Sequence, residues 1–270
     1  MASSLKDFGV RATSALILGI VVLGALFFAG VWGIAVVVAV VAVLASVEFF
    51  MMSRRERRMP HEMIALVAVA VMPLAAAGFG PTGLTAVVAA LTISAFFWHV
   101  MIRQIRLMDT AVTVFGAVYI GFTLSHLVLI CRLEDGVYLA LATIFSVWAN
   151  DIFAYLVGSA LGKHRLAPTI SPKKSWEGLV AGTVGTAGIW LLAGSVLDLP
   201  ISLGALIGIG FVASLAAVIG DLAESRIKRE AHVKDSGTLL PGHGGFLDRF
   251  DSFIMVAIVT YYALILAGVQ

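Results

Sequence analysis

The feature that most constrains this chain is an apolar run from Val10 to Met52, in which the only charged residues are Arg11 and Glu48. About 20 consecutive apolar residues suffice to cross the hydrocarbon core of a bilayer as a helix. The run is therefore long enough for two membrane-spanning helices. Charged residues make up only 13% of the 270 residues, whereas soluble domains carry roughly 25%. A soluble globular fold is therefore excluded.

Similar apolar segments recur to the end of the sequence and predict an all-α, polytopic integral membrane protein with about nine transmembrane helices. We expect about four helices in an N-terminal part, residues 1–108, and the remainder in a C-terminal part, 109–270, which carries the catalytic site. Turn-forming residues separate several segments, among them Pro60, Gly80–Gly83 and Pro200. The predicted segments are 12–30, 31–52, 62–79, 83–102, 109–130, 137–160, 177–197, 201–221 and 252–269.

The distribution of positive charge predicts the orientation. With nine segments, all of the 18 Lys and Arg residues except Arg132 fall on one side of the membrane. Positive residues are retained in the cytoplasm, so we expect the N-terminus inside and the C-terminus outside. Two long loops, at about 161–176 and 222–251, then lie at the cytoplasmic surface, where long loops tend to be functional. The compact chain suggests a bacterial inner (cytoplasmic) membrane.

The first of these loops follows an unusual acidic residue. Asp151 lies within an otherwise apolar segment, where a carboxylate is costly and usually faces a cavity or a partner. Gly158 and Gly162 follow at a spacing that allows helices to approach closely. Lys173 and Lys174 then stand next to each other at the membrane surface. An ordinary positive loop that attracts anionic head groups explains these lysines equally well.

The second loop combines turn-forming, acidic and basic residues. Asp221 lies at the inner end of one segment, whereas Asp248 and Asp251 lie three residues apart at the start of the next. If that start is helical, the latter two share one face. Converging carboxylates among basic side chains suggest a hard divalent cation that holds phosphates, as Mg²⁺ commonly does. The alternative is a charged surface loop whose side chains form salt bridges with one another, which are common and would not indicate a binding site.

From Ser225 to Asp251 the sequence reads SRIKREAHVKDSGTLLPGHGGFLDRFD. This run resembles the signature of the phosphatidate cytidylyltransferases, also called CDP-diacylglycerol synthases. The stretch SPKKSWEG from Ser171 to Gly178, and Asp151 with the nearby Ala154-Tyr155, also resemble that family. The motifs cover roughly the second half of the chain, and the first four segments are only generically similar.

The resemblance implies a nucleotidyltransferase of phospholipid biosynthesis. Its substrates would be CTP and phosphatidic acid, its products CDP-diacylglycerol and diphosphate, and its cofactor one or two Mg²⁺ ions. The lipid phosphate is already largely ionised near neutral pH, because phosphomonoesters have a second pKa near 6. Such transfers depend mainly on positioning and charge neutralisation. The resemblance also implies a homodimer in the bilayer, with no nucleic acid as partner.

Specific residues can be assigned to this chemistry as hypotheses. We expect Asp221, Asp248 and Asp251 to hold the metal. Glycine N–H groups of the second loop would be available to phosphate oxygens, and Asp151 would line the cavity or bond a lysine. The remaining catalytic residues expected are Lys228, Arg229 and Arg249. The expected substrate-binding residues are Asp151, Ser171, Lys173, Lys174, Lys234, His243, Gly244 and Gly245.

Three other functions were weighed against this one. The CDP-alcohol phosphotransferases also use several aspartates in a membrane site, but their spacing is missing here. A CTP-dependent lipid kinase would use similar ligands, and it would transfer the γ-phosphate and release CDP. A transporter would place substrate ligands near the middle of the membrane, whereas the polar residues of this sequence concentrate at one surface.

Overall fold

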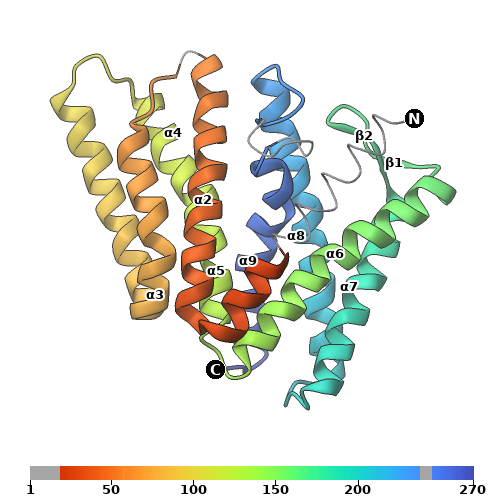
Figure 1. The fold of residues 1–270 in the computed structure, drawn as a ribbon. Coiled ribbons are helices and arrows are strands. Elements are labelled where there is room, and N and C mark those ends of the chain that lie inside the picture. Colours follow the sequence, from red (N-terminus) through yellow and green to blue (C-terminus); the bar gives the residue numbers. More distant parts are fainter. Residues whose placement is uncertain (1–18, 57, 238–244) are drawn as a thin grey trace. The chain divides into compact units, whose positions relative to one another are not determined.

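A computed structural model describes residues 19–56, 58–237 and 245–270. Seven of its helices are long and apolar enough to cross a membrane, and a shorter apolar helix covers Gly19–Phe28. The expectation of an all-α polytopic membrane protein is thus confirmed in outline. The main elements in Figure 1 are α2 (Gly30–Arg55), α3 (Glu62–Met101), α4 (Leu107–Ala117), the π-helix η1 (Val118–Phe122), α5 (Thr123–Ile130), α6 (Gly136–Leu161), β1 (Arg165–Ala167), β2 (Ser171–Ser175), α7 (Trp176–Val196), α8 (Leu203–Glu230) and α9 (Leu247–Leu266).

The chain forms two compact units. The first consists of the residues up to Val128 together with Ala231–Phe250, and the second of Leu129–Glu230 together with Asp251–Gln270. The described residues 231–237 and 245–250 thus associate with helices that precede them by more than a hundred positions. Each unit is described separately below.

In the first unit, α3 is broken near its middle. Gly80 has φ 63° and ψ −149°, a non-helical conformation that only glycine adopts easily. Pro81 follows and lacks the N–H that would continue the helical hydrogen bonds. The break therefore falls at the turn signal between the predicted segments 62–79 and 83–102. Both segments are helical, and together they make up α3.

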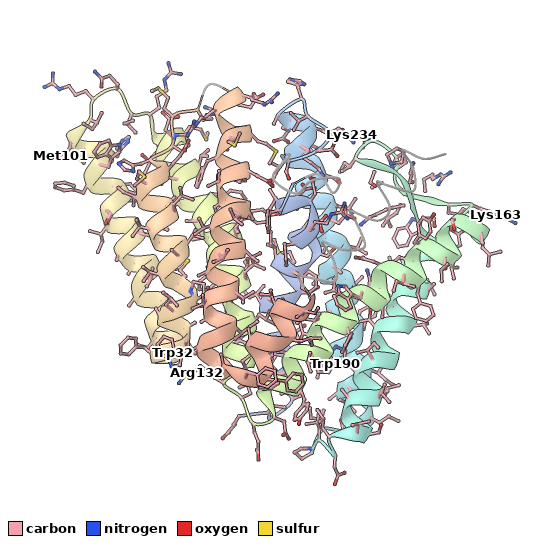
Figure 2. The ribbon with its side chains drawn as sticks, viewed as in Figure 1. Trp32, Met101, Arg132, Lys163, Trp190 and Lys234 are labelled. Carbon is pink, nitrogen blue, oxygen red and sulfur yellow. The ribbon has the colours of Figure 1, made fainter. Side chains whose placement is uncertain are left out.

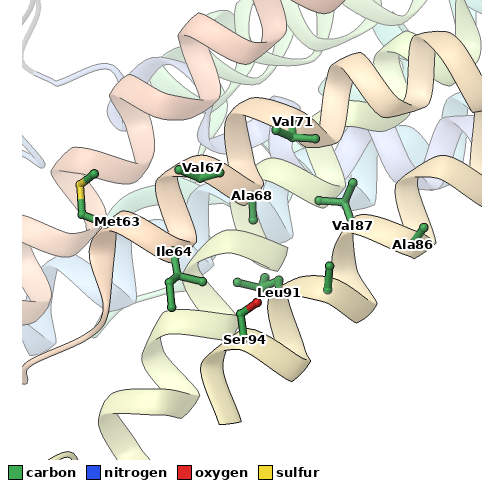
Figure 3. Close-up of a pocket in the computed structure, with 10 residues that line it drawn as sticks. Met63, Ile64, Val67, Ala68, Val71, Ala86, Val87, Leu91 and Ser94 are labelled. Carbon is green, nitrogen blue, oxygen red and sulfur yellow. The ribbon is translucent and has the colours of Figure 1, made fainter. Parts of the chain in front are cut away.

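An apolar cavity opens between the two arms of α3 (Figure 3). Val67 and Val71 line it from the first arm, and Val87 and Leu91 from the second. Ser94 is the only residue with a polar side chain among those that line it. Such walls suit hydrocarbon and carry no charged side chain that could pair with the phosphates of a nucleotide.

In the second unit, α6, α7 and α8 pack together through a ladder of polar side chains. The Ser214 hydroxyl of α8 donates to Asn150 Oδ1 of α6 at 2.7 Å, and Thr183 Oγ1 of α7 lies 2.9 Å from Ser214 Oγ. Glycine at position 182 permits this close approach of α6 and α7, since a Cβ there would lie only 2.6 Å from Asn150 Oδ1. Hydrogen bonds between helices in a membrane contribute about 0.6–2 kcal/mol each. This ladder therefore fixes the three helices that carry the site described below.

In the same unit, a loop assigned to the outer side and a loop assigned to the cytoplasmic side lie at opposite ends of one helix, α6. Figure 2 shows Arg132 and Lys163 beyond opposite ends of α6. Arg132 is the single basic residue assigned to the outer side, whereas Lys163 begins the basic loop assigned to the cytoplasmic side. The helix between them has 26 residues, which is enough to span a bilayer.

The loop predicted at 161–176 contains a small antiparallel hairpin that the sequence did not suggest. Strand β1 pairs with β2, with Arg165 opposite Ser175 and Ala167 opposite Ser171. Pro172 is tolerated in β2 because both strands of a two-stranded ribbon are edges. The hairpin ends directly at α7, whose first turn is capped by the Ser175 hydroxyl, which accepts from Gly178 N at 3.2 Å.

The first part of the loop predicted at 222–251 is helical. Helix α8 continues to Glu230, nine residues past the predicted segment end at Asp221. The continuation is polar, because a helix that leaves the membrane no longer needs apolar side chains. It places Asp221, Glu224 and Lys228 at helical spacing on one face of α8.

Candidate active site

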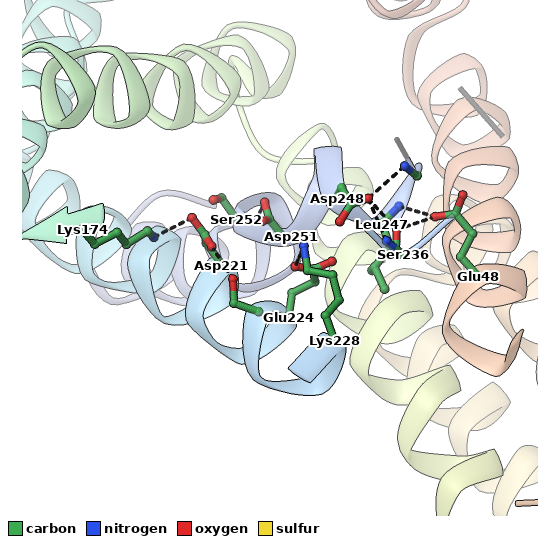
Figure 4. A network of polar contacts seen from close by, with 12 residues as sticks. Glu48, Lys174, Asp221, Glu224, Lys228, Ser236, Leu247, Asp248, Asp251 and Ser252 are labelled. Carbon is green, nitrogen blue, oxygen red and sulfur yellow. Dashed lines mark hydrogen bonds and ion pairs between the residues drawn. The ribbon is translucent and has the colours of Figure 1, made fainter. Parts of the chain in front are cut away.

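The centre of the candidate site is an ion pair between the hairpin and α8. Lys174 Nζ lies 2.6 Å from Asp221 Oδ2, and both side chains are partly exposed (Figure 4). The other oxygen, Asp221 Oδ1, accepts a hydrogen bond from Ser225 Oγ at 3.2 Å, one helical turn further on. Two residues predicted independently from different loops, a substrate-binding lysine and a metal-binding aspartate, are thus in direct contact.

Two further carboxylates interact with this pair. Asp151 of α6 and Asp251 of α9 each lie near enough to Asp221 and Lys174 to interact with them electrostatically. Asp151 also receives a long hydrogen bond of 3.4 Å from Asn150 Nδ2, and the Asp251 side chain accepts from Ser252 N at 2.6 Å. Lys174 therefore contacts one carboxylate and interacts electrostatically with two more. This excess of negative charge favours the binding of a cation.

Helices α8 and α9 approach each other closely beside this cluster. A Cβ placed on Gly220 would lie only 2.4 Å from the carbonyl oxygen of Asp251, which is far inside van der Waals contact. Glycine at this position lets the backbone of Asp251 and Ser252 in α9 lie against α8. The contact brings the backbone of Asp251 next to the residue that precedes Asp221.

Replacing Gly220 by alanine should therefore destabilise the second unit. Overpacking of this kind typically costs about 1–3 kcal/mol, which thermal unfolding in detergent would show as a lower melting temperature. The control is Gly208→Ala in the same helix, where a Cβ meets nothing within 4 Å. That variant should be unchanged or slightly more stable, because alanine favours a helix over glycine by about 1 kcal/mol. Equal melting temperatures for the two variants would contradict the close contact.

A buried ion pair lies one turn beyond Asp221 on α8. Glu224 is fully buried, and its Oε2 lies 2.5 Å from Lys228 Nζ. A buried charge is strongly destabilising without its partner. The pair therefore holds the Lys228 side chain against Glu224 on the surface of α8. Lys228 was predicted as a catalytic residue, and the structure gives it this partner on the same helix face.

The third predicted metal-binding residue, Asp248, belongs to the first unit and has other partners. Its Oδ2 accepts from Ser236 N at 2.9 Å, from Ser236 Oγ at 3.0 Å and from Gly245 N at 2.9 Å. Asp248 therefore shapes the loop that leads into α9 (Figure 4). The negative charge in the first turn of α9 is also favoured by the helix dipole.

The same loop is bound by an acidic residue that we did not assign to the site. Glu48 of α2 is fully buried, and its Oε2 accepts from Ser236 Oγ and from Leu247 N, each at 2.9 Å. One signal for it is visible in the sequence, because a lone carboxylate in an apolar segment usually has a function or a partner. The signal does not indicate the partner, since Ser236 and Leu247 are 188 and 199 residues away.

The remaining predicted residues are placed as follows. Lys173 points away from the paired Lys174, as alternate residues of a strand do, and is exposed. Gly245 is buried beside Ser236, whereas Ser171 is partly exposed. His243 and Gly244 lie outside the described residues. The residues that lie exposed at the ends of α8 and α9 or between them are Arg229, Lys234 and Arg249.

The donor set can be compared with the needs of a magnesium ion. In the described part of the chain, no group of three or more His, Cys, Asp or Glu side chains forms a ready metal cage. Magnesium seldom needs one, because it usually binds one or two carboxylates together with water and substrate phosphates. The carboxylate oxygens of Asp221 and Asp251, in their negatively charged surroundings, are of the kind that such an ion binds.

Comparisons with known proteins agree with the motif resemblance. A model of the cytidylyltransferase family matches residues 9–267. Phosphatidate cytidylyltransferase 5, chloroplastic, of Arabidopsis thaliana is 34% identical over 98% of this chain and 74% of its own length. Phosphatidate cytidylyltransferase of Mycobacterium bovis is 31% identical over 97% of this chain and 89% of its own. The Staphylococcus saprophyticus protein of that name is 39% identical over 57% of this chain and 58% of its own length.

Proposed function

The chain belongs to the cytidylyltransferase family, and we propose that it is a phosphatidate cytidylyltransferase acting on CTP and phosphatidic acid. In this reaction a phosphate oxygen of the lipid bonds to the α-phosphorus of CTP. The bond from that phosphorus to the oxygen bridging to the β-phosphorus breaks, and diphosphate leaves with the electron pair. The product is CDP-diacylglycerol. The names and coverage of the relatives from plants and bacteria support this activity.

The observation that carries the mechanism is the contact of Lys174 with Asp221, with Asp151 and Asp251 close by. The reaction must bring two anions together, and it needs little help from a base because the lipid phosphate is already largely ionised. Lys174 can donate to a phosphate oxygen and reduce the repulsion between the substrates. The carboxylates hold its ammonium group in place until the phosphate arrives. Preorganised charge of this kind is often the largest contribution to catalysis.

We propose Mg²⁺ as the cofactor, as one or two ions, with Asp221 and Asp251 as its protein ligands. When bound, such an ion neutralises phosphate charge and aligns the oxygens of the triphosphate. Asp248 stays a prediction as a further ligand, and its bonds to Ser236 and Gly245 support at least a role in shaping the loop. Lys228, Arg229 and Arg249 stay predictions as phosphate contacts.

We further propose nine membrane crossings, with the N-terminus inside, the C-terminus outside and the site at the cytoplasmic face of a bacterial inner membrane. The two arms of α3 and the helix Gly19–Phe28 support this count beside the other long helices. Lys174 belongs to the hairpin that follows the Lys163 end of α6, the end assigned to the cytoplasm. A cytoplasmic site would meet CTP from solution and phosphatidic acid from the bilayer. A homodimer stays a prediction from the resemblance.

The test is a product assay on the detergent-purified protein. CTP labelled at the α-phosphate is supplied with phosphatidic acid and Mg²⁺, with and without EDTA. We expect the label to enter the lipid fraction, EDTA to reduce the transfer to background, and excess Mg²⁺ to restore it.

Two outcomes would contradict the proposal. Label that stays in the aqueous phase as CDP would mean attack on the γ-phosphorus, and hence a lipid kinase. Transfer that persists in EDTA would remove the divalent cation from the mechanism and leave the basic side chains as the only source of positive charge.

A further inference from the structure

The Glu48 side chain is an ionisable group enclosed within the first unit. It lies in α2 among apolar residues and is fully buried. Burying a carboxylate is expensive unless hydrogen bonds satisfy it, so its partners should show why it is there. Of the two partners named above, Ser236 precedes α9 and Leu247 is the first residue of α9.

The loop encloses this carboxylate closely. A Cβ on Gly237 would lie 2.4 Å from Glu48 Oε1, and a Cβ on Gly245 would lie 2.3 Å from Glu48 Oε2. Both positions therefore need glycine for the backbone to approach the carboxylate. The bond from Leu247 N involves the first residue of α9, where the helix leaves N–H groups without internal partners. Glu48 thus acts as a cap that comes from another helix.

The Ser236 hydroxyl links Glu48 to Asp248. Ser236 Oγ lies 2.9 Å from Glu48 Oε2 and 3.0 Å from Asp248 Oδ2. A hydroxyl has one hydrogen to donate and lone pairs to accept with, so the two carboxyl groups compete for the same atom. The orientation of Ser236 therefore depends on both acids. A change at Glu48 must reach Asp248 through this hydroxyl and through the first turn of α9.

We propose that Glu48 is a positioning residue, which holds Ser236 and the first turn of α9 so that Asp248 keeps a single orientation. It does not touch the substrates, and its effect on the reaction passes through Asp248. The proposal rests on the proposed function in so far as Asp248 serves cytidylyl transfer. The N-terminal half of the chain, where no motif was found, then takes part in orienting Asp248.

The test compares two substitutions at Glu48. Glu48→Met keeps an unbranched side chain of similar length but removes both acceptor oxygens. Glu48→Gln keeps an oxygen that can accept from Leu247 N and Ser236 Oγ. The matched control is Asp109→Leu, which removes another buried carboxylate of the first unit, one that accepts from Met59 N and Arg106 N.

Two readouts are measured on each variant: hydrogen exchange of the peptides that cover 231–237 and 245–250, and kcat with the Mg²⁺ concentration for half-maximal activity. In Glu48→Met we expect exchange to rise about tenfold or more, because buried donors lose their acceptor. We expect kcat to fall by about the same factor and the Mg²⁺ requirement to rise. Glu48→Gln should restore both readouts to within about threefold. Asp109→Leu should leave the exchange of these peptides and the kcat of the folded fraction unchanged.

The outcomes separate the two proposals. Faster exchange with unchanged kcat and Mg²⁺ requirement would overturn the positioning role and leave Glu48 a structural tether. A Glu48→Gln variant as impaired as Glu48→Met would show that the charge matters and not the hydrogen-bond geometry, which would also overturn the proposal. If the wild-type protein transfers no cytidylyl group, the proposed function fails, whereas the exchange data still decide whether Glu48 holds the loop.

Discussion

Replacing Asp221 by asparagine should lower kcat for cytidylyl transfer by about 10²–10³-fold, the range seen when one electrostatic contact to a transition state is removed. The change keeps the size of the side chain and removes its charge. Lys174 then loses the partner at 2.6 Å that holds its ammonium group, and the proposed metal loses a ligand. The measurement is the rate at which α-labelled CTP enters the lipid fraction, per amount of folded protein.

The matched control for Asp221→Asn is Glu230→Gln on the same helix. Glu230 is exposed and pairs with Arg226 at 2.8 Å, and exposed pairs of this kind contribute little. Its rate should stay within about twofold of the wild type. A near-normal rate in Asp221→Asn would remove this residue from the site and leave Asp251 and Asp151 to account for the metal dependence.

Replacing Lys174 by methionine should have the second largest effect, a fall in kcat of about 10²-fold. The variant keeps the aliphatic part of the side chain and removes the ammonium group, which pairs with Asp221 and interacts electrostatically with Asp151 and Asp251. These carboxylates would then repel the phosphates of both substrates. The measurement is the same transfer assay, with kcat and the KM for CTP determined separately.

Lys173→Met provides the comparison, because this neighbouring lysine lies on the opposite side of β2 and is exposed. We expect it to lose less than about tenfold, as for a charge that remains in contact with water. Equal losses in the two variants would mean that the loop acts through its total charge. The pairing of Lys174 with Asp221 would then have no special part in the reaction.

The positions of the apolar segments along the sequence were enough to predict much of the fold. The limits of α6 and α7 differ by only one residue at each end from the predicted segments 137–160 and 177–197. The reason is physical, since a helix in a bilayer must be apolar over its whole length. The break in α3 was also marked, by Gly80 and Pro81. The continuation of α8 to Glu230 could not be predicted in this way, because a helix outside the membrane need not be apolar.

The candidate site was predictable as a set of residues but not as a set of contacts. Lys174 and Asp221 were both named from local motifs, yet nothing in either motif pairs them. The hairpin that turns Lys174 toward Asp221 and Lys173 away depends on strand register, which the basic sequence around Pro172 does not reveal. Glu48 was missed as part of the loop because its partners are nearly two hundred residues away.

The polar ladder of Asn150, Thr183 and Ser214 bears on how the protein is made. The three side chains come from α6, α7 and α8, which leave the ribosome one after another. Until α8 has entered the bilayer, Asn150 lacks the Ser214 hydroxyl as a donor in surroundings with little water. A chain that stops before α8 would therefore expose an unsatisfied amide to lipid or to neighbouring proteins. Helix α6 thus gains its full set of hydrogen bonds only after α8 has been made, late in biosynthesis.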